Sequence, residues 1–227
     1  LSELGPRGDA IVEADWCLGE LKKTLEAEGI IDNTLIIFSS DNGPVLNDGY
    51  YDDSDVKNGD HLPSGPLRGG KYSLFEAGTR VPFFTYWKGK IKPGVSDSMV
   101  SQLDLLSSLA QLVGSEVRTA DSLPLLELLM GQSDEGRDEM VIEATSRTAF
   151  KRGDWVMIPP YEGPAVNDKV QIELGNYSDF QLYNLTEDIE QQNNLAALKP
   201  DKLKEMLTAF EAIRGDDYGK IEKLELK

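Results

Sequence analysis

The first forty residues contain the pattern that most restricts the fold: a helix, a turn and a buried strand in direct succession. Apolar residues recur at helical spacing through residues 8–28, and Gly29 is a natural helix stop. After an Asp-Asn turn, residues 34–38 are almost continuously apolar and rich in branched side chains, as in strands covered on both faces. A helix leading into such a strand is the second half of a βαβ unit, so the sequence predicts an α/β fold.

The rest of the chain divides into two parts. Residues 80–87 read as a strand, and helices are expected at 101–113 and 122–130. A polar stretch near residue 132 then precedes short strand-like runs at 140–144, 146–151, 155–158, 170–174 and 180–185, and an amphipathic helix at 200–214. We therefore expect residues 1–132 to belong to the α/β domain and residues 133–227 to form a smaller, strand-rich α+β subdomain.

The composition excludes several classes of protein. There are 40 acidic and 23 basic residues, a net charge of −17, so we expect binding to neither nucleic acid nor anionic membranes. A local cluster of bases could still hold a small anion. Because no apolar run approaches the ~20 residues of a membrane helix, we expect no membrane span. The single Cys17 excludes an internal disulfide, and the single His61 excludes most histidine-rich metal sites.

Asp41 and Asn42 directly follow the predicted strand, at the end where α/β sheets place their chemistry. A carboxylate and an amide carbonyl are hard oxygen ligands that suit calcium or magnesium. Calcium takes about six to eight oxygens, so most of its ligands would come from elsewhere. Asp-Asn-Gly-Pro consists entirely of turn formers, and on spacing alone a plain turn is an equal alternative.

A glycine-rich segment at residues 65–72 carries two cations, Arg68 and Lys71. Glycines let the backbone approach a ligand closely, and the two cations suit an oxyanion. The spacing from Gly65 to Lys71 matches part of a phosphate loop. However, Tyr72 stands where the metal-binding Ser or Thr would be, and no strand precedes the glycines, so we reject that interpretation. The alternative is an ordinary glycine-rich loop with solvated bases.

Together these segments resemble the type I sulfatase (arylsulfatase-like) family, and most of all the polysaccharide sulfatases of gut and marine bacteria. The resemblance covers most of the chain. It is carried by NTLIIFSSDNGP (33–44), PLRGGK (66–71) and FEAGTRVPF (75–83), with further matches at 87–91, 101–106, 181–188 and 194–196. It implies an alkaline-phosphatase-like α/β fold, of which this chain would be the C-terminal portion, followed by a subdomain with a small antiparallel sheet.

The resemblance also implies an activity: removal of sulfate from a sulfated carbohydrate or an aryl sulfate. It implies a calcium ion whose ligands include Asp41 and Asn42, and a substrate sulfate in contact with Lys71. A metal and an ammonium at the sulfate oxygens would stabilise the charge that moves onto the leaving oxygen as the S–O bond breaks. Carbohydrate-degrading bacterial members are typically exported, which implies a periplasmic or secreted location.

The family's nucleophile is a formylglycine made from Cys or Ser in a C/S-x-P-x-R segment near the N-terminus. We expect it to be absent from this chain: Cys17 has no Pro or Arg at the required offsets and is interpreted as a helix-packing thiol. The family's N-terminal Asp pair, which completes the calcium site, is expected outside the chain too. The chain would then be a C-terminal half, inactive alone, whose partner is the missing N-terminal half.

Two weaker candidates and two other functions stay open at this point. His61, on the long loop before Lys71, could contact substrate or simply be solvated. Arg68 could bind substrate or, like Arg80, be a structural anchor. The chain could instead be a non-catalytic pseudo-sulfatase that binds an anion. It could also be a phosphatase relative of the same superfold, although such enzymes mostly use two metals and several histidines.

Overall fold

The computed structural model describes residues 2–117 and 119–215, which form two compact units. The first, here called the sheet unit, takes in 2–14, 40–81 and 140–215. The second, the ribbon unit, takes in 15–39 and 82–139. The first helix, α1 (Gly5–Ala27), contributes residues to both. The expected boundary between 132 and 133 stays a prediction, because a spatial grouping of residues does not define folding domains.

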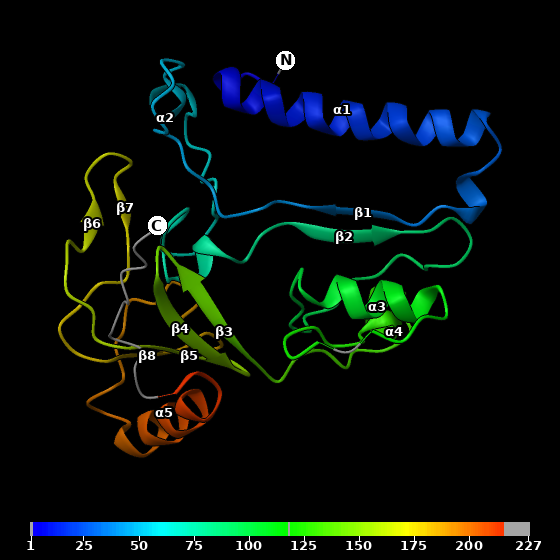
Figure 1. Ribbon diagram of the computed structural model, residues 1–227. Coiled ribbons are helices and arrows are strands. Elements are labelled where there is room, and N and C mark those ends of the chain that lie inside the picture. The colour runs from blue at the N-terminus through cyan, green and yellow to red at the C-terminus, as the bar shows by residue number, and fades with distance from the viewer. Residues whose placement is uncertain (1, 118, 216–227) are drawn as a thin grey trace, which may run out of the picture. The chain divides into compact units, whose positions relative to one another are not determined.

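The sheet unit is built on a four-stranded sheet with the strand order β3-β4-β5-β8 (Figure 1). The strands are β3 (Glu139–Ala144), β4 (Arg147–Arg152), β5 (Trp155–Ile158) and β8 (Gln181–Asn184). β5 is antiparallel to both β4 and β8. Arg152 pairs with Trp155 across a two-residue loop in which Gly153 has φ 53°. The hairpin expected at these residues is therefore confirmed.

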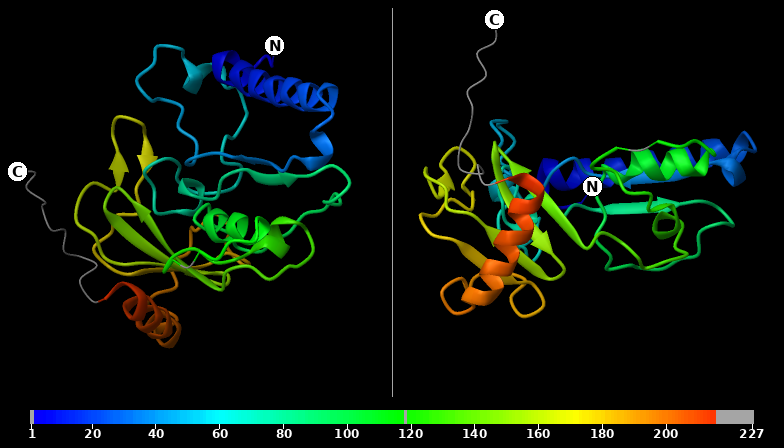
Figure 2. Two further views of the ribbon diagram at one scale, coloured as in Figure 1. Left: turned by 45° about the vertical axis from the view of Figure 1, so that its right-hand side comes forward. Right: turned by 60° about the horizontal axis from the view of Figure 1, so that its bottom comes forward.

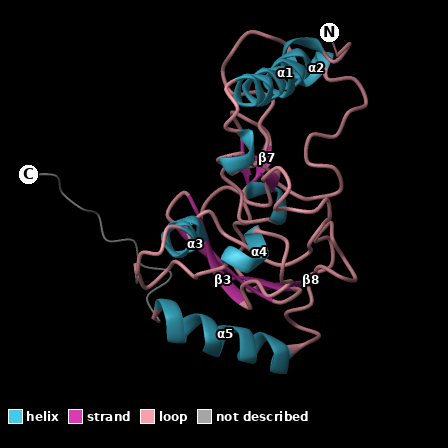
Figure 3. Ribbon diagram, turned by 90° about the vertical axis from the view of Figure 1, so that its right-hand side faces the viewer, coloured by secondary structure: helices cyan, strands magenta, loops and turns pink. Residues whose placement is uncertain are grey.

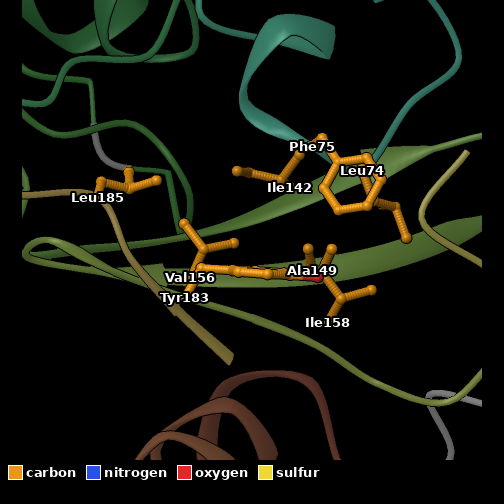
Figure 4. Close-up of a cluster of buried hydrophobic side chains, with 8 residues drawn as sticks. All are labelled: Leu74, Phe75, Ile142, Ala149, Val156, Ile158, Tyr183 and Leu185. Atoms are coloured by element: carbon orange, nitrogen blue, oxygen red, sulfur yellow. The ribbon is translucent and has the colours of Figure 1, made fainter. Parts of the chain in front are cut away.

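Both faces of this sheet are covered, because successive side chains of a strand point to opposite faces. On one face lies α5 (Pro200–Arg214) (Figures 2 and 3). Its Met206 and Phe210 are buried in a cluster with residues of the sheet. On the other face, Ala149 packs in a cluster with Leu74 and Phe75 (Figure 4). The sheet thus holds the segment that begins just after Lys71.

The ribbon unit contains a short ribbon of two antiparallel strands, β1 (Ile36–Ser39) and β2 (Phe83–Tyr86). Phe38 and Phe84 stack across it, with ring centroids 5.0 Å apart. We expected β1 to be covered on both faces, but its four residues are only half-buried. The reason is that β2 is its one partner strand among the described residues.

Two predicted elements are shorter than expected. The helix expected at 122–130 is reduced to α4 (Leu126–Leu129). The residues before it bond to α3 (Asp104–Leu112) instead: the Leu123 N–H donates to Asp104 Oδ1 at 2.8 Å, and the Ser107 N–H to Ser122 Oγ at 3.0 Å. The strand expected at 170–174 is reduced to β7 (Ile172–Glu173), which pairs with an unexpected strand, β6 (Val166–Asn167).

The remaining elements are short: η1 (Ile31–Asn33), α2 (Ser54–Lys57) and η2 (Glu76–Gly78). Within the described part of the chain, every helix is too short or too polar to cross a bilayer.

Candidate active site

The two segments singled out in the sequence meet in the sheet unit. The Lys71 N–H donates to Pro44 O at 3.0 Å, and the Gly43 N–H donates to Gly78 O at 2.9 Å. Glycine permits this approach: a Cβ on Gly43 would lie 1.7 Å from Ala77 O, which no side chain can tolerate. The Asp41–Pro44 turn and the loop that carries Lys71 are therefore one structure.

Asp41 and Asn42 keep oxygen atoms that could bind a cation. Asp41 Oδ1 accepts from the Asn42 N–H at 3.0 Å, and Asn42 Nδ2 donates to Gly43 O at 3.0 Å. Asp41 Oδ2 and Asn42 Oδ1 have no hydrogen-bond partner among the described residues. Two hard oxygens fit part of a calcium shell of about six to eight. The described residues contain no group of three or more His, Cys, Asp or Glu side chains able to hold a metal.

Lys71 is positioned by backbone and keeps its charge unpaired. Its side chain is half-buried, and Nζ lies 5.4 Å from the ring centroid of Tyr72. No carboxylate within the described ranges forms an ion pair with it. Tyr72 itself has φ 76°, a conformation that costs a non-glycine residue roughly 1–2 kcal/mol and is enriched at functional sites. An ammonium held this way can bind an anionic ligand.

A buried ion pair fixes the chain just after Lys71. The side chain of Glu76 is only 2% exposed, and both of its oxygens accept from Lys151 Nζ of β4 at 2.9 Å. Arg80 lies at 3.6 Å from the same carboxylate. The Glu76 N–H donates at 2.8 Å to the side chain of Gln191, which is fully buried. These bonds tie η2 to β4 and to the loop after β8.

Arg68 anchors the chain just before Lys71. Its Nε and Nη2 donate to the two oxygens of Glu173 at 2.7 and 2.8 Å, and its Nη1 donates to Gln191 O at 2.6 Å. The guanidinium also lies over the ring of Phe75, with Cζ 4.0 Å from the centroid. Hydrogen bonds to Glu173 raise the pKa of Arg68, and those same bonds lower the pKa of Glu173. Arg68 is thus engaged within the protein.

A family model described as Sulfatase matches residues 2–115, half of the chain. The chain belongs to the sulfatase family. An N-acetylgalactosamine-6-O-sulfatase from Bacteroides thetaiotaomicron is 40% identical over 217 residues, which cover 94% of this chain and 42% of the relative. Human arylsulfatase A is 36% identical over 138 residues, covering 60% of this chain and 25% of the relative.

The solved structures agree. One from work on glycosaminoglycan metabolism by Bacteroides thetaiotaomicron superposes with a TM-score of 0.89 at 39% identity, over 93% of this chain and 45% of that one. The PsFucS1 sulfatase from Pseudoalteromonas sp. superposes with a TM-score of 0.72 at 25% identity, over 91% of this chain and 42% of that one. The fold is therefore the alkaline-phosphatase-like fold of the sulfatases. The chain spans less than half the length of these relatives.

The chain contains one match to the C/S-x-P-x-R pattern, at residues 64–68, so the expectation that it has no such segment is wrong. Ser64 lies in a turn in which its carbonyl accepts from the Leu67 N–H at 3.1 Å. The arginine of this match is Arg68, which is engaged with Glu173 and Gln191. Three of the five matching residues, including the proline and the arginine, already belong to the PLRGGK motif. We therefore do not assign Ser64 a catalytic role.

His61 is exposed on the loop before Lys71. Its carbonyl accepts from Asn58 Nδ2, and its imidazole has no hydrogen-bond partner in the described part of the chain. The structure does not join His61 to Asp41 or Lys71 by any contact. Its expected contact with substrate stays a prediction.

The side chains that hold the site in place were not predicted from the sequence. Glu76 stands in an apolar setting between Phe75 and Ala77, and an acid in such a setting needs a partner, so this signal was available. Lys151 and Gln191 give no comparable signal, because they are 75 and 115 residues away from Glu76 in the chain.

Proposed function

We propose that this chain is the metal- and sulfate-binding part of a sulfatase that acts on a sulfated carbohydrate. One observation carries the proposal: in a member of the sulfatase family, the Asp41–Asn42 turn and the Lys71 loop are bonded into a single structure. The 40% identity to an N-acetylgalactosamine-6-O-sulfatase supports a sulfated sugar as substrate, and the similarity to human arylsulfatase A keeps aryl sulfates as an alternative.

In the reaction that we propose, water cleaves the sulfate ester into an alcohol and inorganic sulfate. The S–O bond to the sugar breaks, and its electron pair stays on the sugar oxygen, which takes up a proton. The Lys71 ammonium holds a sulfate oxygen and stabilises the charge that builds up during cleavage. A calcium ion on Asp41 Oδ2 and Asn42 Oδ1, when bound, would withdraw charge from the same sulfate group.

We further propose that the nucleophile comes from outside the 227 residues. Cys17 is exposed on α1, so its interpretation as a helix-packing thiol is wrong. It still lacks the Pro and Arg of the pattern, and Ser64 lies in a turn, so neither is offered as a formylglycine precursor. The 227-residue chain is then inactive alone and needs an N-terminal half with the formylglycine and the remaining calcium ligands. We propose an exported, periplasmic or secreted location, as for other carbohydrate-degrading sulfatases.

A chimera tests the proposal. The N-terminal part of the 40%-identical Bacteroides relative, up to the start of its match with this chain, is fused to the 227-residue chain and produced in a bacterium that matures sulfatases. We expect the chimera to release sulfate from N-acetylgalactosamine 6-sulfate and the isolated chain to release none. Lys71→Ala in the chimera should lower kcat/KM by about 10²–10³-fold, the usual cost of removing one group that stabilises a developing charge.

The controls separate the remaining interpretations. Cys17→Ser and Ser64→Ala should leave the activity of the chimera within about twofold, whereas Asp41→Asn should weaken calcium retention. Sulfate release by the isolated chain would refute the proposal that the nucleophile comes from outside the 227 residues. A folded chimera that binds the sugar sulfate without cleaving it would favour the non-catalytic, anion-binding function.

A further inference from the structure

Arg147 differs from the paired arginines of the described chain, because no carboxylate neutralises it. Arg68 pairs with Glu173, Arg80 with Glu76, and Arg137 with Asp104. The Arg147 guanidinium instead donates from Nη1 to Asn176 Oδ1 and from Nη2 to Thr145 Oγ1, both of which are neutral. In a chain of net charge −17, a half-buried cation without a counterion calls for an explanation.

The strand β4 places Arg147 on the face of the sheet that carries the Lys71 loop. Side chains two residues apart on a strand share a face. Lys151 reaches Glu76, and Ala149 packs in the cluster with Leu74 and Phe75 (Figure 4). Lys151 thus contacts residue 76, and Ala149, two residues earlier on β4, packs with residues 74 and 75. Arg147 is the next residue on this face, so the same progression takes it toward Tyr72, in the turn that contains Lys71.

A second contact places Asn176 in the same region. The Leu74 N–H donates to Leu174 O at 3.1 Å, and a Cβ on Gly175 would lie 3.0 Å from the Cβ of Leu74. The residue that follows Gly175 is Asn176, the partner of Arg147. The Arg147–Asn176 pair is therefore connected to Lys71 through only a few residues on each side.

The Arg147 guanidinium is held in one orientation, but it can still donate further hydrogen bonds. Asn176 is 7% exposed, and its Nδ2 donates to Pro164 O at 2.7 Å, which turns its oxygen toward Arg147. Arginine has five N–H donors, and the contacts of Arg147 with the described residues leave several of them unused. Burial lowers the pKa of Arg147 because the charged form loses hydration, and a bound anion would compensate for that loss.

Exposed residues stand next to Arg147 and its partner Asn176 in the chain. Tyr177, next to Asn176, is 55% exposed, and its carbonyl accepts from the Tyr161 N–H at 2.9 Å. An exposed, backbone-anchored aromatic ring offers a surface on which a sugar can pack. Thr145 and Ser146, also exposed, form the turn that leads into Arg147.

We propose that Arg147 binds a second anionic group of the sulfated glycan, on a sugar next to or the same as the one whose sulfate meets Lys71. The ligand is a planar carboxylate or a second sulfate, which a guanidinium binds through paired hydrogen bonds. The inference rests on the proposed function, because it places the sulfate to be removed at Lys71.

The test uses binding to the 227-residue chain, which needs no catalysis. The probes are N-acetylgalactosamine 6-sulfate, its disaccharide with glucuronate, the 4,6-disulfate of the same sugar, and the glucuronate disaccharide without sulfate. Binding is followed by calorimetry and by the side-chain Nε–Hε NMR signal of Arg147 in chain labelled with ¹⁵N-arginine. We expect the glucuronate disaccharide or the 4,6-disulfate to bind about tenfold more tightly than the 6-sulfate and to shift this signal.

Four variants complete the experiment. Arg147→Gln should abolish the tenfold gain, and Arg147→Lys should restore only part of it, because an ammonium lacks the paired donors. Arg152→Gln, which removes the same charge from the exposed far end of β4, should leave the gain intact. Lys71→Gln should weaken every probe that carries the 6-sulfate.

The outcomes separate the two proposals. A gain in affinity with the glucuronate disaccharide would show that Arg147 binds a carboxylate. A gain with the 4,6-disulfate would show that it binds a second sulfate. A gain that survives Arg147→Gln, or an Arg147 signal that no probe shifts, overturns the inference. If Arg147→Gln does not fold, the NMR signal of the unaltered chain still decides. Unchanged binding of the 6-sulfate to Lys71→Gln would refute the proposed sulfate contact, while the unsulfated disaccharide still reports on Arg147.

Discussion

Two neighbouring stretches of the sheet unit are held in opposite ways. The stretch 68–80, here called the anchored segment, is bonded to β4, β7 and the loop after β8, and all of its residues from 73 to 78 are buried. The stretch 45–64, here called the open loop, exposes Tyr50, Tyr51, Val56 and Leu62 by 69% or more. Only three residues separate the two stretches in the chain, and each stretch carries a candidate site residue.

This difference separates the two candidates. Lys71 lies in the anchored segment, whose bonds fix its backbone before any ligand arrives, so less reorganisation is needed to place its charge at a transition state. His61 lies in the open loop, where the structure shows little that would fix its ring. The fold therefore supports Lys71 as a site residue more strongly than His61.

Among the changes that test this comparison, breaking the buried Glu76–Lys151 ion pair should lower the free energy of unfolding the most. Lys151→Met leaves the Glu76 carboxylate buried without its main partner, and such a change costs about 3–5 kcal/mol. We expect the lower end of that range, because Arg80 remains at 3.6 Å. The measurement is the free energy of unfolding in urea.

A second variant shows whether charge is the cause. Glu76→Gln combined with Lys151→Met removes both charges and should recover part of the lost stability. If the single variant Lys151→Met unfolds at the same urea concentration as the unaltered chain, the pair does not hold the anchored segment.

Adding a side chain at Gly43, where the backbone closely approaches Ala77, should have the next largest effect on stability. Gly43→Ala would put a Cβ 1.7 Å from Ala77 O, so the two segments must separate, at a cost of about 1–3 kcal/mol. In the open loop, Gly49→Ala meets no atom within 4 Å and costs about 1 kcal/mol through its φ of 98° alone. Sulfate binding, measured by calorimetry, should weaken only in Gly43→Ala. Equal effects of both variants on sulfate binding would show that the Gly43 contact does not shape the site.

The sequence predicted the regular elements better than the links between them. The helix at 200–214 and the hairpin at Gly153 follow from periodicity and turn chemistry, which are local, and both were found where expected. Asp41, Asn42 and Lys71 were singled out by residue type and family resemblance. That their segments bond to each other depends on Gly43 approaching Ala77, a contact between residues far apart in the chain, which no local pattern encodes.

A change of pH should affect the anchored segment through Glu173. Because the pKa of Glu173 is lowered in the folded state by Arg68, the pair stabilises the protein above the ordinary glutamate value of 4.5. This contribution is lost as the pH falls through the lower pKa of the folded state. The partial exposure of Glu173 limits it to about 1 kcal/mol or less.

The corresponding measurement compares the unaltered chain with Glu173→Gln. The difference between their free energies of unfolding should be largest near neutral pH and should shrink below about pH 4.5. A difference that grows on acidification would mean that Glu173 does not act through its charge.

The smallest effect should come from the ion pair of the open loop. Lys57 Nζ lies 3.0 Å from Asp53 Oδ2, but the two side chains are 50% and 65% exposed. Solvent screens such a pair, so Lys57→Met should change the free energy of unfolding by only about 0.3 kcal/mol, roughly a tenth of the effect of Lys151→Met. The two substitutions are chemically identical, and the ion pairs that they remove differ in burial. Comparable losses from both would contradict the division of this unit into an anchored segment and an open loop.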